Sequence, residues 1–184
     1  MLTGNPENPN PAPDAPAPHI RPETPADRAA VAEVNRLAFG GEAEGRLVER
    51  LHADGLVVAS LVAEDAGRVV GHILFSRLPL ETARGDLPAA SLAPMAVRPE
   101  RQGRGIGAAL VRAGLAACRE RGCVAVVVLG HPGYYPRFGF SAALAAGLEA
   151  PWRGEALMAL ELVPGALAGR RGRLRYPAAF AEVG

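Results

Sequence analysis

The sequence predicts an α/β (α+β) domain built around a mixed β-sheet. Two β-rich runs, residues 57–64 and 69–78, are joined by a short turn-forming segment, which predicts an antiparallel hairpin. Further along the chain, a strand over residues 89–97, a helix over residues 106–121 and a strand over residues 124–129 predict a right-handed parallel crossover. Antiparallel and parallel pairing in one chain together indicate a mixed sheet.

The N-terminal elements follow from capping residues and apolar spacing. Residues 19–22 predict a short strand, and Thr24 with Asp27 three positions later predicts the start of a helix. Its buried face is defined by apolar residues at helical spacing, namely Ala30, Val31, Val34, Leu37 and Ala38. Gly40 ends that helix, and a second helix is predicted over residues 44–52.

A proline interrupts the strand over residues 89–97, which follows a predicted polar loop at residues 81–88. Because Pro94 has no N–H to donate to a ladder, we expect a bulge or a local break in pairing there. A break leaves neighbouring strands splayed, with a slot between them. After the crossover come an aromatic segment, residues 132–140, and a further strand over residues 156–163.

Composition limits the classes of function. The chain has 184 residues, 49% of them hydrophobic and 21% charged, which suits one globular domain with a sizeable core. A formal net charge of +1 gives no global field that favours nucleic acid or an anionic membrane. All the basic side chains are arginines, which excludes a phosphate-loop lysine and a Schiff-base lysine. The cysteines and histidines show no metal-ligand spacing, so we expect no metal.

The two ends of the chain are unlike the middle. Residues 1–18 are rich in proline and poor in large apolar groups, so we predict a disordered tail there and a single domain over residues 19–184. The arginines of residues 170–175 predict a solvated edge strand and not a nucleic-acid surface. No signal-peptide pattern and no membrane-spanning apolar run is present. We therefore expect a cytoplasmic monomer or homodimer without a membrane or nucleic-acid partner.

Glycines at the junction between strand and helix predict an anion-binding turn. Gly103, Gly105 and Gly107 alternate just before the predicted helix, leaving backbone N–H groups exposed beside the positive end of the helix dipole. The run also matches the dinucleotide fingerprint of a Rossmann fold, and a purely structural turn is a second alternative. The Rossmann reading requires an acidic residue after the next strand and a shorter turn, and the sequence has neither.

Two motifs carry a resemblance to a known family. The run from Val97 to Gly107, VRPERQGRGIG, resembles the acetyl-CoA-binding signature of the GNAT-type N-acetyltransferases, and residues 134–140, YYPRFGF, resemble that family's aromatic segment. Residues 126–140 and 158–167 are similar to a bacterial YhbS-like subgroup. The resemblance covers about residues 19–180. It implies the GNAT fold, a mixed and centrally splayed β-sheet flanked by helices on both faces.

The resemblance also implies that acetyl-CoA is the acetyl donor and that these motifs bind it. The pantetheine arm would pair with the strand before the turn, and the pyrophosphate would lie on the amides after it. The implied cofactor-binding residues are Met95, Ala96, Val97, Gln102, Gly103, Arg104, Gly105, Ile106, Gly107 and Ala108. Among them, Gln102 is expected to shape the turn, and Arg104 either contacts the phosphates or faces solvent.

Tyr135 aligns with the family's tyrosine that protonates the sulfur of coenzyme A, so it is the implied catalytic residue; the alternative is that it only forms a wall of the aromatic segment. Tyr134 aligns with an apolar phenylalanine, which predicts core packing. The residue that accepts the proton of the amine stays open. The candidates are Glu42, Glu44, Glu64, His131 and water, and His131 alternatively caps a turn.

The sequence thus predicts an acetyl-CoA-dependent N-acetyltransferase that transfers an acetyl group to a primary amine by direct transfer in a ternary complex. Neither Cys118 nor Cys123 falls in the predicted slot, which disfavours a covalent acetyl-enzyme. The alternative is a catalytically weak acyl-CoA-binding regulatory module of the same fold. It draws its support from the absence of a glutamate in the strand over residues 89–97. The identity of the acceptor stays open.

Overall fold

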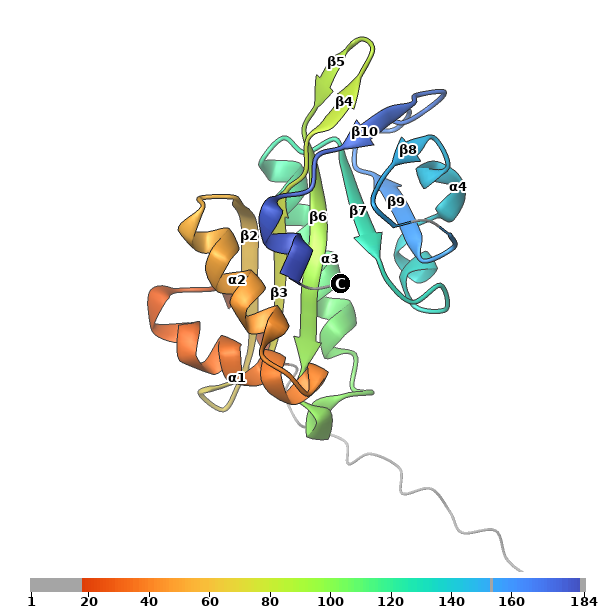
Figure 1. Ribbon diagram of the computed structural model, residues 1–184. Helices are drawn as coiled ribbons and strands as arrows, with labels where there is room; N and C mark the ends of the chain where they lie inside the picture. Colours follow the sequence, from red (N-terminus) through yellow and green to blue (C-terminus); the bar gives the residue numbers. More distant parts are fainter. Residues whose placement is uncertain (1–17, 153, 183–184) are drawn as a thin grey trace, which may run out of the picture.

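The computed structural model describes residues 18–152 and 154–182, and they form two sheets with helices packed around the larger one (Figure 1). The larger sheet has six strands in the order β1-β2-β3-β6-β7-β9, with antiparallel pairing throughout except between β6 and β7. Its strands are β1 (His19–Pro22), β2 (Val57–Asp65), β3 (Arg68–Arg77), β6 (Ala89–Val97), β7 (Ala125–Leu129) and β9 (Leu157–Glu161). The predicted mixed sheet is confirmed.

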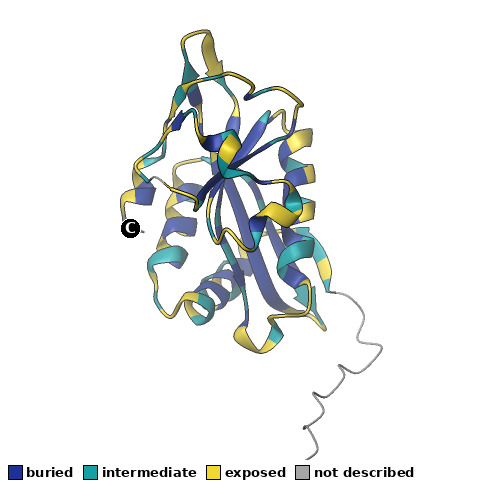
Figure 2. Cartoon of the chain, turned by 90° about the vertical axis from the view of Figure 1, so that its right-hand side faces the viewer, coloured by how far each residue is buried: buried dark blue, intermediate teal, exposed yellow. Residues whose placement is uncertain are grey.

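Helices cover both faces of this sheet. α1 (Arg28–Phe39) and α2 (Ala43–Ala53) pack on one face, with Val31, Val34 and Leu51 buried against β2 and β3. α3 (Ile106–Glu120) packs on the other face and provides the crossover from β6 to β7. Buried residues therefore form a continuous layer through the sheet, as Figure 2 shows. α2 and α3 lie within one residue of their predicted bounds. The first helix begins later than predicted, at Arg28, because the residues after Thr24 form the 3-10 turn η1 (Pro25–Asp27); Thr24 and Asp27 do form the expected capping box.

The expected break at Pro94 is present. In the β3–β6 ladder, Ile73 pairs with Met95 and Phe75 pairs with Leu92, so β6 carries one extra residue around the cis Ala93–Pro94 peptide. On its other side, β6 pairs with β7 only from Ala89 to Ser91. Beyond that point the two strands separate, and the remainder of β6 faces an opening (Figure 1).

A second, four-stranded sheet differs from the prediction. Residues 81–88, predicted as a loop, form most of a hairpin of β4 (Leu80–Thr82) and β5 (Gly85–Leu87). This hairpin pairs with β10 (Gly172–Leu174), and β10 pairs on its other side with β8 (Leu148–Glu149). The arginine-rich strand is therefore interior and not at an edge. Strands of two or three residues are too short for their side chains to show a period in the sequence.

The remaining segments are short: the 3-10 turns η1 (Pro25–Asp27), η2 (Pro99–Arg101), η3 (Tyr135–Phe138) and η4 (Ala178–Glu182), and the helix α4 (Ala142–Ala145). Apart from Pro18, the segment predicted as a disordered tail lies outside the described residues, so its disorder and the domain limits stay predictions. In the part of the chain that the structure describes, no helix is long and apolar enough to cross a membrane. No group of three or more potential metal ligands occurs there either.

Candidate active site

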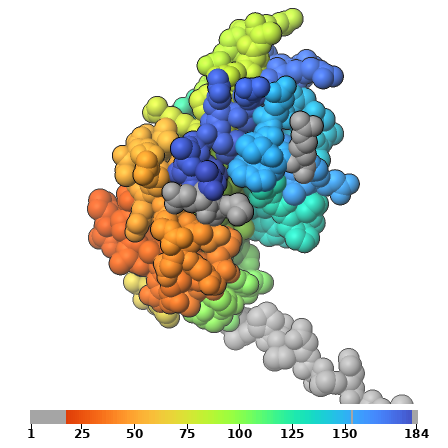
Figure 3. All heavy atoms as spheres, viewed as in Figure 1, coloured from red at the N-terminus to blue at the C-terminus, as the bar shows by residue number. Residues whose placement is uncertain are grey.

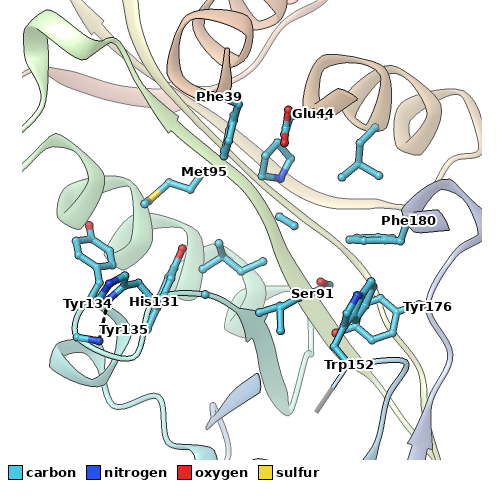
Figure 4. Close-up of a pocket in the computed structure, with 17 residues that line it drawn as sticks. Phe39, Glu44, Ser91, Met95, His131, Tyr134, Tyr135, Trp152, Tyr176 and Phe180 are labelled. Carbon is cyan, nitrogen blue, oxygen red and sulfur yellow. Dashed lines mark hydrogen bonds between the residues drawn. The ribbon is translucent and has the colours of Figure 1, made fainter. Parts of the chain in front are cut away.

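The opening between β6 and β7 is a cavity of about 680 Å³ (Figure 4). One wall is the part of β6 that is paired with β3 but not with β7, and the opposite wall is the segment that follows β7. The residues that line the cavity are Phe39, Glu44, Leu47, Ser91, Leu92, Ala93, Pro94, Met95, Leu129, Gly130, His131, Gly133, Tyr134, Tyr135, Trp152, Tyr176 and Phe180. Its volume is in the range of sites for small molecules.

The register of β6 determines which backbone groups face this opening. The N–H of Arg98 donates to the carbonyl of Val70, so Ala96 exchanges its hydrogen bonds with His72 on β3. The N–H and C=O groups of Met95 and Val97 therefore point away from β3, toward the open side. The Gln102 side chain donates from Nε2 to the Val97 carbonyl over 3.0 Å, across the turn. An extended chain entering the opening would find the N–H and C=O of Met95 and the N–H of Val97 free, whereas Ala96 is buried beneath α1 and α2.

A smaller cavity of about 240 Å³ lies next to the first, around the glycine turn and the start of α3. Gly103 and Gly105 have φ angles of 73° and 79°, which favour glycine. The first hydrogen bond of α3 runs from the N–H of Ala109 to the carbonyl of Gly105. The N–H groups at the first three positions of α3 therefore have no acceptor within the helix. They lie at the positive end of a helix of 15 residues.

Most of the predicted cofactor-binding residues line this second cavity, and two do not. The lining residues are Met95, Val97, Arg101, Gln102, Gly103, Gly105, Ile106, Gly107, Ala108, Tyr134 and Arg137. Arg104 is exposed and lies outside the lining, and Ala96 is buried elsewhere. The sequence did not predict Arg101, whose guanidinium pairs with Asp65, or Arg137. Arg137 adds positive charge to the rim of the cavity, whereas the charge of Arg101 is balanced by Asp65.

Tyr134 joins the two cavities, because it lines both, together with Met95. A β-carbon on Gly107 would lie 2.9 Å from the Tyr134 hydroxyl, so the absence of a side chain at Gly107 makes room for Tyr134. The Arg137 guanidinium lies 4.6 Å from the centre of the Tyr134 ring. The prediction that Tyr134 packs in the core is thus wrong in part: the ring contacts its aromatic neighbours, but the side chain is half-buried and faces both cavities.

Tyr135 is a buried wall of the larger cavity, held by aromatic contacts. Its ring meets those of Tyr134 and Phe140 edge to face, with centroids 5.1 and 5.6 Å apart. Burial, with a smaller contribution from the Tyr134 hydroxyl, raises the pKa of Tyr135 to about 12. The phenol is therefore protonated at neutral pH and able to donate a proton or a hydrogen bond into the cavity.

Of the four candidate side chains for the base, two line the larger cavity and two lie outside it. Glu44 and His131 line the larger cavity. Glu64 pairs with Arg21, which bridges it to Asp27, and Glu42 is exposed at the N-cap of α2. His131 also accepts a hydrogen bond at Nδ1 from the N–H of Gly133 over 3.1 Å, so it does cap a turn, as one alternative predicted.

The end of the larger cavity farthest from Met95 is aromatic and was not predicted. Trp152, Tyr176 and Phe180 lie there, on segments that follow β8 and β10 (Figure 4). The C-terminal segment reaches this place because η4 packs against α2, as Figure 3 shows. These residues are isolated in sequence and belong to no motif, so only the three-dimensional arrangement brings them together.

Comparison with known proteins identifies the family. Residues 19–143 match the model of the acetyltransferase (GNAT) domain. The chain belongs to the GNAT family of acetyltransferases, and the predicted fold class and enzyme class are confirmed.

Relatives of known name extend along most of the chain. It is 38% identical over 160 residues to the uncharacterized N-acetyltransferase YhbS of Escherichia coli K12, covering 85% of this chain and 95% of YhbS. The crystal structure of Escherichia coli YhbS in complex with CoA matches with a TM-score of 0.84 and 35% identity, covering 94% of this chain and 97% of that one. The crystal structure of a GNAT family acetyltransferase from Brucella melitensis in complex with acetyl-CoA matches with a TM-score of 0.73 and 37% identity, covering 88% of this chain and 97% of that one. The predicted resemblance to the YhbS-like subgroup is confirmed.

Proposed function

We propose that this protein transfers the acetyl group of acetyl-CoA to a primary amine by direct transfer in a ternary complex. The observation that carries the proposal is the junction of two cavities at Met95 and Tyr134. One has free amides at a helix N-terminus, which suit a pyrophosphate. The other has a free strand edge and a protonated phenol, which suit a pantetheine arm and its thioester. The complexes of the two relatives with CoA and acetyl-CoA support the same assignment.

In this proposal, the pyrophosphate accepts hydrogen bonds from the amides between Gly103 and Ala108, with Arg137 adding charge at the rim. The pantetheine amides pair with the free N–H and C=O of Met95 and the free N–H of Val97. Gln102 acts indirectly, because its side chain ties the turn to the Val97 carbonyl. Two predicted contacts receive no support from their positions, those of Arg104 and Ala96.

The chemistry follows from the groups around the thioester. A neutral amine attacks the carbonyl carbon, a C–N bond forms, and the tetrahedral intermediate collapses with loss of the C–S bond. Tyr135 donates its proton to the departing sulfur, which leaves as the thiol of CoA. The proton released by the amine passes to Glu44, to His131 or to water. Tyr135 then regains its proton from solvent.

Direct transfer is favoured over a covalent acetyl-enzyme by the positions of the thiols. Cys118 and Cys123 are both buried, and neither lines the two cavities described above. Both are free, which fits the reducing conditions of the cytoplasm, where we place the protein. We propose one catalytic domain over residues 19–184, with no nucleic-acid or membrane partner.

A thiol-release assay over a panel of primary amines tests the proposal. We expect acetyl-CoA-dependent release of CoA with at least one amine, and a rate about 100-fold lower for Tyr135→Phe at nearly unchanged affinity for acetyl-CoA. An unchanged rate in that variant would remove Tyr135 from the mechanism. Binding of acetyl-CoA without turnover on any amine would favour the alternative of an acyl-CoA-binding regulatory module.

A further inference from the structure

The aromatic end of the larger cavity has a composition that selects among amines. Trp152 and Tyr176 meet edge to face with centroids 4.9 Å apart, and Tyr176 meets Phe180 at 5.2 Å. The three rings come from different segments and converge on the end away from Met95, as Figure 4 shows. If the thioester enters beside Met95, this aromatic end is the space left for the acceptor. A flat apolar group fits between such rings better than a polyhydroxylated one.

Glu44 and Tyr176, which both line the cavity, each carry a polar group that has no protein partner among the described residues. The Glu44 carboxylate lines the cavity from α2, between Phe39 and Phe180, and forms no ion pair or hydrogen bond with a described residue (Figure 4). The Tyr176 hydroxyl is buried beside Ser91 in a geometry that completes no hydrogen bond. The cavity therefore combines a free carboxylate with an apolar body.

We propose that the acceptor is an arylalkylamine, a primary amine carried on a short chain from an aromatic ring and without an anionic group. The ring would pack between Trp152, Tyr176 and Phe180, and the ammonium would be attracted to Glu44. An acid group beside the amine would meet the Glu44 carboxylate and lose its hydration against apolar walls. This inference rests on the proposed function, since it assigns the acceptor of that reaction.

The chain provides its own reporter, because Trp152 is the single tryptophan. The experiment titrates the CoA-saturated protein with phenethylamine and follows tryptophan emission, so that binding is measured without turnover. We expect a saturable change with phenethylamine. Ethylamine lacks the ring and phenylalanine adds a carboxylate, and each is expected to bind at least about tenfold more weakly.

Variants separate the contribution of charge from that of the rings. Glu44→Gln should lower the affinity for phenethylamine by about tenfold and change the affinity for CoA by no more than about twofold. Glu49→Gln changes an exposed glutamate on the same helix and is the matched control. Trp152→Ala removes one wall, so the kcat/KM for phenethylamine should fall by at least about tenfold while the KM for acetyl-CoA is retained. Circular dichroism and urea unfolding establish that each variant folds.

The outcomes distinguish this inference from the proposed function. Equal binding of phenethylamine and ethylamine, or equal binding of phenethylamine and phenylalanine, would overturn the acceptor class. So would CoA binding without any response of Trp152 to phenethylamine. Each of these results leaves the acetyltransferase proposal standing. Failure of CoA itself to bind would overturn both.

Discussion

The ring of Tyr135 lies directly against the α-carbon of Gly130, so that a β-carbon on Gly130 would be 2.2 Å from the ring atom Cε2. Gly130 follows β7, and Tyr135 begins the turn η3. The segment between them therefore turns back so that Gly130 contacts the Tyr135 ring. No residue other than glycine fits at position 130 without displacing the ring. Gly130 is thus a positioning residue for the proposed proton donor.

Gly130→Ala is therefore expected to impair catalysis more than binding. Displacing the phenol by about 1 Å should lower kcat by about 10- to 100-fold, because proton transfer depends on alignment. Affinity for acetyl-CoA, measured by calorimetry, should change little, since the backbone groups of β6 and α3 are untouched. A wild-type kcat in this variant would show that the position of Tyr135 does not matter.

Ionisation of Tyr135 is not expected to lower kcat at any pH in the usual assay range. Burial raises the pKa of its phenol to about 12, and the protonated donor therefore persists to higher pH than an exposed tyrosine would allow. A profile measured from about pH 6 to pH 10 should carry no alkaline limb that depends on Tyr135. An alkaline limb that disappears in Tyr135→Phe would contradict this expectation.

Gly114 on α3 tests the packing of the crossover helix. A β-carbon there would lie 2.1 Å from the ring of Phe75, which is fully buried on β3. Gly→Ala inside a helix ordinarily stabilises by up to about 1 kcal/mol, but overpacking costs about 1–3 kcal/mol. We expect Gly114→Ala to lower the free energy of unfolding in urea. A more stable variant would mean that Phe75 moves aside at little cost.

A buried polar network links α1 to the sheet on the face away from α3. Asn35 lies 3.2 Å from Nδ1 of His72, and Nε2 of His72 lies 3.0 Å from the Ser60 hydroxyl, which donates to Glu23. Arg28 and His52 also contact the Glu23 carboxylate. His72 and Asn35 are fully buried, so this serine–histidine pair has a structural role and not a catalytic one.

This network predicts how stability depends on pH. Burial alone would raise the pKa of Glu23, but hydrogen bonds from His72 and Ser60 outweigh it and lower the pKa to about 2. Burial lowers the pKa of His72 below its ordinary 6.5. In both cases the unfolded chain binds more protons, so stability is lost as pH falls below 6.5 for His72, and from 4.5 toward 2 for Glu23.

Urea unfolding of Glu23→Gln at about pH 7 and about pH 3 measures this effect, because the contribution of Glu23 is lost between pH 4.5 and about 2. Since the substitution breaks a buried charged network, we expect the variant to lose about 3–5 kcal/mol at neutral pH. It should also lose less stability than the wild type on acidification. The exposed substitution Glu49→Gln is the control. Identical pH dependence in Glu23→Gln and the wild type would refute the assignment to Glu23.

Much of the fold follows from local signals in the sequence. The helices, the hairpin and the crossover each carry a period of apolar residues long enough to read, and Pro94 predicts the break that opens the sheet. The glycine turn could be located because it lies directly between a strand and a helix. The short strands of the second sheet could not be predicted, because contacts between distant segments stabilise them.

The candidate site also has a part that could be predicted from the sequence and a part that could not. The residues proposed to bind the cofactor lie close together in the sequence, whereas Glu44 and the rings of Trp152, Tyr176 and Phe180 come from separate segments. The apolar residue that aligns with Tyr134 in the family predicts core packing, and only the proximity of Gly107 in the structure shows its second role. The four candidate side chains for the base became two once the lining of the cavity was known.

Gly105 offers a direct test of the cradle for the pyrophosphate. It precedes α3, has a φ angle of 79° and has open space where a β-carbon would point. Gly122, at the other end of the same helix, has the same φ angle and the same open space. Aspartate therefore strains the backbone equally at both positions, but only at Gly105 does it place a negative charge beside the free amides.

The most direct test of the proposed cofactor site is calorimetric titration with acetyl-CoA. The proteins compared are the wild type, Gly105→Asp and Gly122→Asp. We expect the wild type and Gly122→Asp to bind with similar affinity, and Gly105→Asp to bind at least about 100-fold more weakly. Absence of binding to the wild type, or undiminished binding to Gly105→Asp, would contradict the proposal that this turn holds the pyrophosphate of acetyl-CoA.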